Sequence, residues 1–183
     1  MPLLQKEFWD FNETKNYITV NILGNNYKVL NIYPDYYTAV NLLNKINYII
    51  NQICIYFIIN YHRYSTKDKI LIDCFCDIHP NKHLLSEMQL NTPFYGINKP
   101  RYLYNTNKYP VGPDGTYRAK YRHIFLTLRD KNGKFNNFDK IMKLVIHEIA
   151  HTMCNHIRWR EDDHGEDFKH AEQMIIHVYN KIR

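Results

Sequence analysis

The sequence predicts a single α+β domain, and three observations lead to this fold class. Two β-prone runs surround a Gly/Asn turn at Gly24, an apolar stripe with a period of about 3.6 residues follows Pro34, and two amphipathic segments occupy the last quarter of the chain. The 183 residues, 45% of them hydrophobic, have globular composition. We expect one domain over residues 1–183, with a small, mostly antiparallel sheet packed against a core helix.

The segment 1–90 is expected to contain a hairpin and the core helix. Residues 17–32 are predicted to form two strands around Gly24-Asn25-Asn26. Residues 69–75 have the composition of a strand, and residues 81–90 are predicted as a short helix. The core helix after Pro34 is predicted from apolar residues at helical spacing: Leu42, Leu43, Ile46, Ile49, Ile50, Ile53, Tyr56 and Phe57.

The segment 91–134 is expected to be a basic loop followed by a strand. Proline and glycine recur over residues 91–117, which predicts a long loop without extended regular elements. Residues 122–130 are predicted as a strand that ends at the turn 131–134. This strand is expected either to border the active-site cleft and pair with an extended substrate, or to lie in the interior without a substrate role.

The segment 138–183 is expected to contain two helices, over about 138–156 and from Glu166 onward. The second is amphipathic and is predicted to bury Phe168, Ala171, Ile175, Val178 and Ile182.

The positive charge of the chain is concentrated in one segment. Between Lys99 and Lys134 there are nine Lys or Arg and two acidic residues, and tyrosines are interleaved with the cations. Such a pattern suits phosphate contacts and base stacking, although a solvated loop face explains it as well. The candidate nucleic-acid contacts are Arg101, Arg118, Lys120 and Arg122.

Cysteine usage and the amino terminus predict an intracellular protein, cytoplasmic or nuclear. Four scattered cysteines do not form a disulfide framework, and residues 1–7 do not resemble a secretory signal. The most apolar stretch, 46–59, is interrupted by polar residues, so no membrane association is expected. The abundance of Asn, Ile, Tyr and Lys is typical of an AT-rich genome, such as that of a large DNA virus. The oligomeric state is left open.

Residues 147–151 read His-Glu-x-x-His within the first of these C-terminal helices. Two His four positions apart share a helix face, so both imidazoles can bind one Zn²⁺ at about 2.0–2.1 Å. Glu148 can remove a proton from a water molecule activated by the metal. Composition alone predicts about 0.02 matches of this kind in the chain. We therefore predict a catalytic site for one Zn²⁺, with His147 and His151 as ligands and Glu148 as general base.

A catalytic zinc site needs a third protein ligand and an open position. His164 is favoured because it lies beside Gly165, where the chain can reverse and present its side chain to the first helix. His156 and Glu172 are the alternatives. Asp162, Asp163 and Glu166 are expected to cap helices or to be solvated, and an outer carboxylate on a ligand imidazole is also possible.

A second, structural zinc site is a separate possibility at Cys74, Cys76, His79 and His83. The spacing of these residues is poor, and simple packing of the cysteines is the favoured explanation.

The motif His147-Glu148-Ile149-Ala150-His151, followed by His164-Gly165-Glu166-Asp167-Phe168, resembles the SprT-like and WLM group of zinc metallopeptidases. Their pattern is a His-Glu-x-x-His helix and then His-Gly-Pro-x-Phe at the start of a second helix. The resemblance covers residues 141–176 and implies a compact zincin-like fold with His147, His151 and His164 as zinc ligands. It also implies protein substrates crosslinked to or bound on DNA. Glu166 stands where the family has proline.

Two function classes follow from these residues. The first is a zinc metalloendopeptidase that hydrolyses peptide bonds of a protein or peptide substrate, with DNA as a further partner. The second is a catalytically silent, zinc-stabilised protein that binds nucleic acid through the basic segment 99–134 or serves as a structural component of an assembly.

Overall fold

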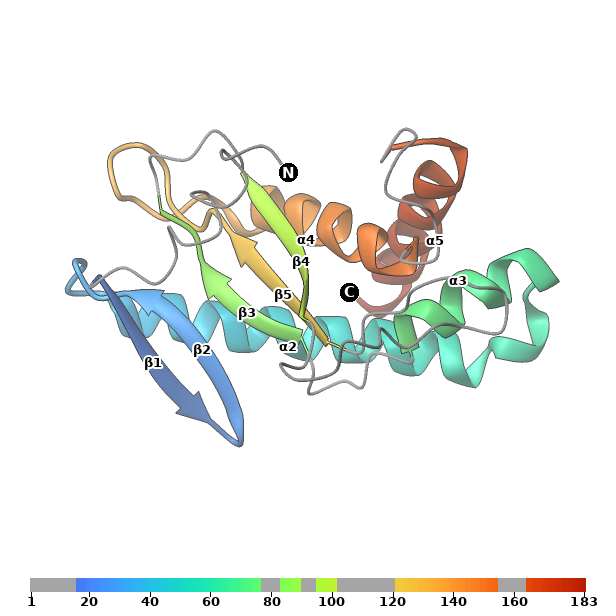
Figure 1. Ribbon diagram of the computed structural model, residues 1–183, viewed down its shortest axis with the longest axis horizontal. Coiled ribbons are helices and arrows are strands. Elements are labelled where there is room, and N and C mark those ends of the chain that lie inside the picture. Colours follow the sequence, from blue (N-terminus) through green and yellow to red (C-terminus); the bar gives the residue numbers. More distant parts are fainter. Residues whose placement is uncertain (1–15, 77–82, 90–94, 102–120, 155–163) are drawn as a thin grey trace, which may run out of the picture.

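The computed structural model describes residues 16–76, 83–89, 95–101, 121–154 and 164–183 (Figure 1). Its strands are β1 (Tyr17–Ile22), β2 (Asn25–Leu30), β3 (His83–Glu87), β4 (Gly96–Arg101) and β5 (Tyr121–Leu126). Its α-helices are α2 (Tyr36–Ile59), α3 (Thr66–Cys76), α4 (Phe138–Met153) and α5 (Glu166–Ile182), and a 3-10 turn, η2 (Tyr61–Arg63), joins α2 to α3. The predicted α+β class is confirmed.

The five strands form one mixed sheet in the order β1-β2-β3-β5-β4. β1 and β2 form the predicted antiparallel hairpin, and β4 pairs antiparallel with β5 at the opposite edge. Between them, β3 runs parallel to both β2 and β5. Antiparallel pairing therefore occupies both edges of the sheet and parallel pairing its centre.

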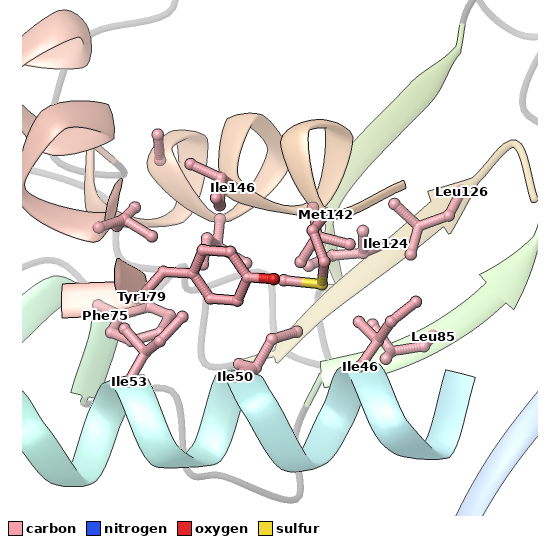
Figure 2. Packing of buried hydrophobic residues seen from close by; sticks show 14 of the residues in the cluster. Ile46, Ile50, Ile53, Phe75, Leu85, Ile124, Leu126, Met142, Ile146 and Tyr179 are labelled. Atoms are coloured by element: carbon pink, nitrogen blue, oxygen red, sulfur yellow. The ribbon is translucent and has the colours of Figure 1, made fainter. Parts of the chain in front are cut away.

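The core lies between the sheet and two long helices, α2 and α4 (Figure 2). Ile46, Ile50 and Ile53 of α2 point toward α4, as the apolar periodicity predicts. Ile124 and Leu126 of β5 close this layer from the side of the sheet. The same layer fixes α4, the helix that carries the His-Glu-x-x-His motif.

The prediction of a strand at 69–75 was wrong, because this segment lies within helix α3. Ser65 and Asp68 cap the start of the helix reciprocally: Ser65 Oγ accepts from Asp68 N–H (3.2 Å), and the Asp68 carboxylate accepts from Ser65 N–H (3.3 Å). Leu71, Ile72 and Phe75 then lie on one buried helix face. The capping pattern Ser65-x-x-Asp68 is visible in the sequence, and it favours a helix more strongly than the composition of residues 69–75 favours a strand.

The prediction of a short helix at 81–90 was also wrong, because β3 occupies His83–Glu87. This strand pairs along its length with β5, from His83 opposite Arg122 to Glu87 opposite Leu126. Those partners lie about forty residues away in the sequence, so local propensity does not reveal the pairing.

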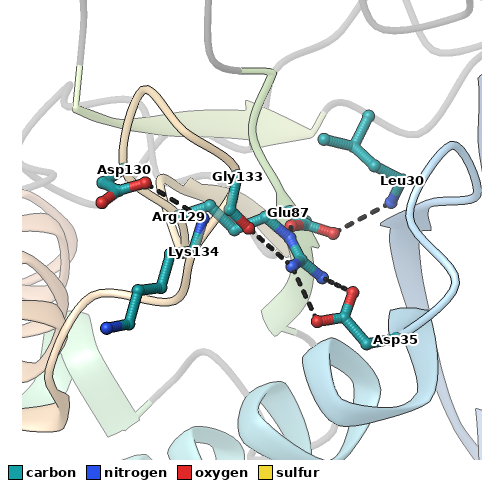
Figure 3. Close-up of polar contacts among 7 residues, drawn as sticks. All are labelled: Leu30, Asp35, Glu87, Arg129, Asp130, Gly133 and Lys134. Atoms are coloured by element: carbon teal, nitrogen blue, oxygen red, sulfur yellow. Dashed lines mark hydrogen bonds and ion pairs between the residues drawn. The ribbon is translucent and has the colours of Figure 1, made fainter.

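The predicted strand at 122–130 forms as β5 but ends at Leu126, and Arg129 then makes a single bridge to Phe135. The Arg129 side chain is buried and ion-paired with Glu87 (2.8 Å) and Asp35 (2.8 Å) (Figure 3). Its guanidinium also donates to the carbonyl oxygen of Gly133 (3.0 Å). This network ties β3, the start of α2 and the turn before α4 together.

The loop predicted over 91–117 contains a regular element, because Gly96–Arg101 forms strand β4. The strand carries Pro100, which is tolerated at a sheet edge. The rest of the predicted loop, over 91–94 and 102–117, lies outside the described residues.

Among the described residues, α2 alone is long and apolar enough to cross a membrane by length and composition. Its Ala39, Val40, Leu43, Ile46 and Ile50 belong to the core of the domain. The core helix of a soluble protein passes the same test, so the expected location of the protein stays a prediction.

Candidate metal centre

Helix α4 presents the His-Glu-x-x-His motif near its C-terminal end. The helix begins after Asn137, whose side chain accepts a hydrogen bond from Lys140 N–H (2.8 Å), and ends at Met153. His147 and His151 are partly exposed and lie on one face, while Glu148 is 4% exposed. The helix therefore offers two imidazoles beside a buried carboxyl group.

His164 meets these two residues at the start of α5. It precedes Gly165, the residue at the N-cap position of that helix, as the predicted chain reversal requires. Each of the three His residues offers one ring nitrogen, and these nitrogens lie within 4.8 Å of one another. Nε2 of His164 is 3.2 Å from Nε2 of His147. Two nitrogen ligands of one tetrahedral Zn²⁺ are about 3.3 Å apart, so this spacing fits a shared ion.

The three imidazoles form a regular triangle. Their ring centroids are 5.0 Å apart for His147–His151, 5.0 Å for His147–His164 and 5.0 Å for His151–His164. Phe168 is 3% exposed and packs against all three rings, with centroid distances of 4.9, 4.5 and 4.7 Å. A buried aromatic ring thus supports the whole ligand set and limits the rotation of each imidazole.

The His151 imidazole is held in its neutral form. Burial lowers the pKa of His151 to about 4, and the nearby His147, His164 and Arg122 lower it further in the same direction. A neutral imidazole is the form that binds a metal ion. His151 is therefore prepared as a ligand at neutral pH.

The carboxyl group of Glu148 is buried. Burial raises the pKa of Glu148 to about 8. Gly96 of β4 lies directly against it: a Cβ at position 96 would meet Glu148 Oε1 and would lie 2.9 Å from Glu148 Cδ. The edge strand β4 therefore borders the candidate site on the side of Glu148. Figure 1 shows β4 running alongside α4.

Sequence reasoning missed Asn98, which attaches this strand to the helix. Its amide nitrogen donates to the carbonyl oxygen of Glu148 and to Oγ1 of Thr152 (2.8 Å). Thr152 is fully buried. Nothing in the local sequence around Asn98 indicates this contact, because it joins residues about fifty positions apart.

The alternatives for the third ligand fall in different places. Glu172 lies on the far side of His147, with its Oε1 3.4 Å from Nδ1, and is not part of the group of converging ligand atoms. His156, Asp162 and Asp163 lie outside the described residues. Glu166 is exposed and pairs with Lys169 (3.2 Å). Of the described candidates, His164 alone completes the set with His147 and His151.

The sequence left two roles open for the strand 122–130, at the cleft or in the interior, and the structure places it in the interior of the sheet. β5 is hydrogen-bonded to β3 on one side and β4 on the other, so neither of its edges is open. This is the interior placement that the sequence left as the other possibility. The edge strand next to β5 is β4.

The candidate nucleic-acid contacts are only partly described. The Arg122 side chain is 5% exposed and its guanidinium lies 3.5 Å from Asn98 Oδ1, so it faces the interior. Arg101 lies on β4, and only its backbone is described. Arg118 and Lys120 lie outside the described residues.

Of the four residues of the possible second zinc site, Cys74 and Cys76 alone have described side chains, so this site stays untested. Cys74 and Cys76 lie on helix α3, and Cys76 Sγ is 3.2 Å from Cys54 Sγ of α2. His79 lies outside the described part of the chain, as does the side chain of His83. Within that part, His147, His151 and His164 form the one group suited to a metal ion.

No family model matches the chain, and no curated protein or solved structure matches it significantly. The resemblance to the SprT-like and WLM metallopeptidases therefore stays a prediction that rests on the two motifs.

Proposed function

We propose that the protein is a zinc-dependent metalloendopeptidase. The observation that carries this proposal is the convergence of three imidazoles, with Nε2 atoms of His147 and His164 3.2 Å apart, next to the buried carboxyl group of Glu148. Three His ligands with a fourth position left for water are typical of catalytic zinc, whereas structural zinc sites have four protein ligands. A structural site has no need of an adjacent buried acid.

The residues of the chain divide the reaction between them. When bound, zinc supplies a Lewis acid and lowers the pKa of water at the site toward about 7. His147, His151 and His164 hold the ion. Glu148 removes a proton from the attacking water and then donates it to the nitrogen of the departing amine, so that one peptide bond and one water molecule become a carboxylic acid and an amine.

The position of β4 supports a peptide as the substrate. β4 is the terminal strand of the sheet and has a described pairing partner on one side only. Gly96 of this strand touches the carboxyl group of Glu148. An extended peptide added along this edge by main-chain hydrogen bonds would pass beside the proposed base. The DNA-linked substrates implied by the family resemblance stay a prediction, because residues 102–120 of the basic segment lie outside the described part.

The test compares the wild-type protein with Glu148→Gln and the control Glu166→Gln. We expect all three to bind one zinc ion per chain by elemental analysis. Cleavage of an unfolded protein substrate should fall by about 10²–10⁴-fold in Glu148→Gln and stay unchanged in the control. Wild-type activity in Glu148→Gln would contradict the role of Glu148. Stoichiometric zinc without cleavage by the wild-type protein of either free or DNA-bound substrates would favour the silent, zinc-stabilised alternative.

A further inference from the structure

Helix α5 presents three residues of the candidate centre at successive spacings of four. His164 stands just before the helix, Phe168 lies in its first turn and Glu172 one turn later. Residues four apart lie on the same helix face. This face packs against α4, where Phe168 contacts the imidazoles of His147 and His151. Glu172 therefore continues the line of residues that faces the ligand set.

The two nitrogens of His147 have different neighbours. Nε2 is 3.2 Å from Nε2 of His164, within the group of converging ligand atoms. Nδ1 is 3.4 Å from Oε1 of Glu172. The side chains of His147 and Glu172 are 36% and 33% exposed. The carboxylate thus approaches the ring nitrogen of His147 other than the one that faces His164.

A neutral imidazole that binds a metal through Nε2 carries its proton on Nδ1. A carboxylate that accepts this proton in a hydrogen bond fixes the tautomer, orients the ring and makes Nε2 a better donor to the metal. We propose that Glu172 is a positioning residue of the metal centre, which acts through Nδ1 of His147 and does not bind the ion itself. This inference rests on the proposed function, because it requires that the three His residues hold a metal.

The position of Glu172 is set independently of any ion. Two ion pairs attach α5 to the start of α3: Lys67 with Asp167 (2.6 Å) and Asp68 with His170 (2.6 Å). One partner of each pair, Asp167 or His170, lies within two residues of Phe168 in the sequence. Helix α5 is therefore docked through contacts that do not involve His147, and Glu172 is held beside that imidazole by the fold.

The experiment measures metal affinity, with four variants: Glu172→Ala, Glu172→Gln, His164→Ala and the control Glu166→Ala, which removes an exposed carboxylate from the same helix. Zinc affinity is measured by competition with a chromophoric chelator. We expect Glu172→Ala to bind zinc about 10–100-fold more weakly at unchanged stoichiometry. Glu172→Gln should recover part of this loss, because its amide oxygen still accepts a hydrogen bond. Glu166→Ala should match the wild type.

The visible spectrum of the Co²⁺-loaded protein separates positioning from ligation. Glu172→Ala should keep the band positions and intensity of the wild type, whereas His164→Ala should change them. Wild-type zinc affinity in Glu172→Ala would overturn the inference. So would a changed cobalt spectrum in Glu172→Ala together with an unchanged one in His164→Ala, since Glu172 would then be the ligand. If the wild-type protein binds neither zinc nor cobalt, the proposed function itself is wrong, and the inference about Glu172 is wrong with it.

Discussion

Gly96 and Glu148 are in such close contact that no side chain fits between the edge strand and the proposed base. A Cβ at position 96 would lie 2.7 Å from Leu144 Cδ1 and 2.9 Å from Glu148 Cδ, besides meeting Glu148 Oε1. The contact joins β4 to the centre of the His-Glu-x-x-His motif. It also makes the position of the carboxyl group depend on a strand about fifty residues away in the sequence.

The first prediction concerns this contact. Gly96→Ala should displace the Glu148 carboxyl group, because both Glu148 and Leu144 would have to move to admit the new methyl group. A misplaced base lowers kcat by about 10²-fold. Zinc stoichiometry should stay at the wild-type value, because the three atoms nearest to the new methyl group belong to Glu148 and Leu144 and not to a His residue. Peptidase kinetics and elemental analysis measure the two effects. Wild-type kcat in Gly96→Ala would show that Glu148 does not need this position.

The second prediction concerns the attachment of β4 to α4. Asn98→Ala should lower the free energy of unfolding by about 1–3 kcal/mol, because it removes the donor to the buried Thr152 hydroxyl. A double-mutant cycle with Thr152→Val isolates the pair by urea unfolding, and we expect a coupling of at least about 0.5 kcal/mol. The matched control Asn136→Ala removes an exposed contact to Lys140. Additive effects of the two core substitutions would argue against a direct interaction.

The third prediction concerns acid stability. The hydrogen bond from Arg129, and then its charge, hold the pKa of Asp35 below the ordinary value of 3.8. A carboxyl group with a lowered folded-state pKa stabilises the protein above its unfolded pKa and loses this effect as the pH falls through the folded pKa. The wild type should therefore be more stable than Asp35→Asn at pH 5 to 7, and the difference should shrink below pH 3.8. Urea unfolding from pH 7 to pH 3 measures it.

The stability contribution of Glu87 changes with pH in the opposite direction to that of Asp35. Burial raises the pKa of Glu87 above 4.5, although the Leu30 N–H and Arg129 oppose the shift. The contribution of Glu87 to the free energy of unfolding is therefore fully present below pH 4.5, and it is lost as the pH rises through the raised folded-state pKa. Both proteins keep Glu87, but the charge of Asp35 also raises the pKa of Glu87, so the difference reports on Asp35 together with its effect on Glu87. A difference that grows toward low pH would contradict the assignment.

The fourth prediction concerns metal removal. A ligand at 100 times its dissociation constant adds about 2.7 kcal/mol to the stability of the folded state. In a chain of this length that corresponds to a rise in Tm of roughly 5–10 °C. We expect zinc to produce this rise in wild type and in Glu148→Gln, and a chelator to reverse it. His164→Ala should show little of it, because one of the three ligands is lost. An equal zinc-induced rise in the Tm of His164→Ala would show that His164 is not a ligand.

The sequence alone predicted the helices that have strong local signals and two members of the candidate metal site, His147 and His151, and it favoured His164 as the third. The apolar period of α2, the motif on α4 and the His-Gly step before α5 are all local patterns, and each element formed where it was predicted. The short helix and the short strand between α2 and β4 were harder to predict from the sequence. The segment predicted as a strand forms helix α3, whose start is capped by Ser65 and Asp68. The segment predicted as a helix forms β3, because its partner strand β5 is distant in the sequence.

Only the tertiary structure decided how the site is assembled and what surrounds it. Packing of α5 on α4 brings His164 to His147 and puts Glu172 on the outer nitrogen, a choice that sequence spacing left open. The order of the strands put β4 at the edge and β5 inside the sheet, which decided between the two roles that the sequence left open for β5. The physical reason is common to all of these: helix periodicity is set by neighbours within one or two turns, whereas contacts such as Gly96 with Glu148 depend on chain segments that meet only when the core is packed.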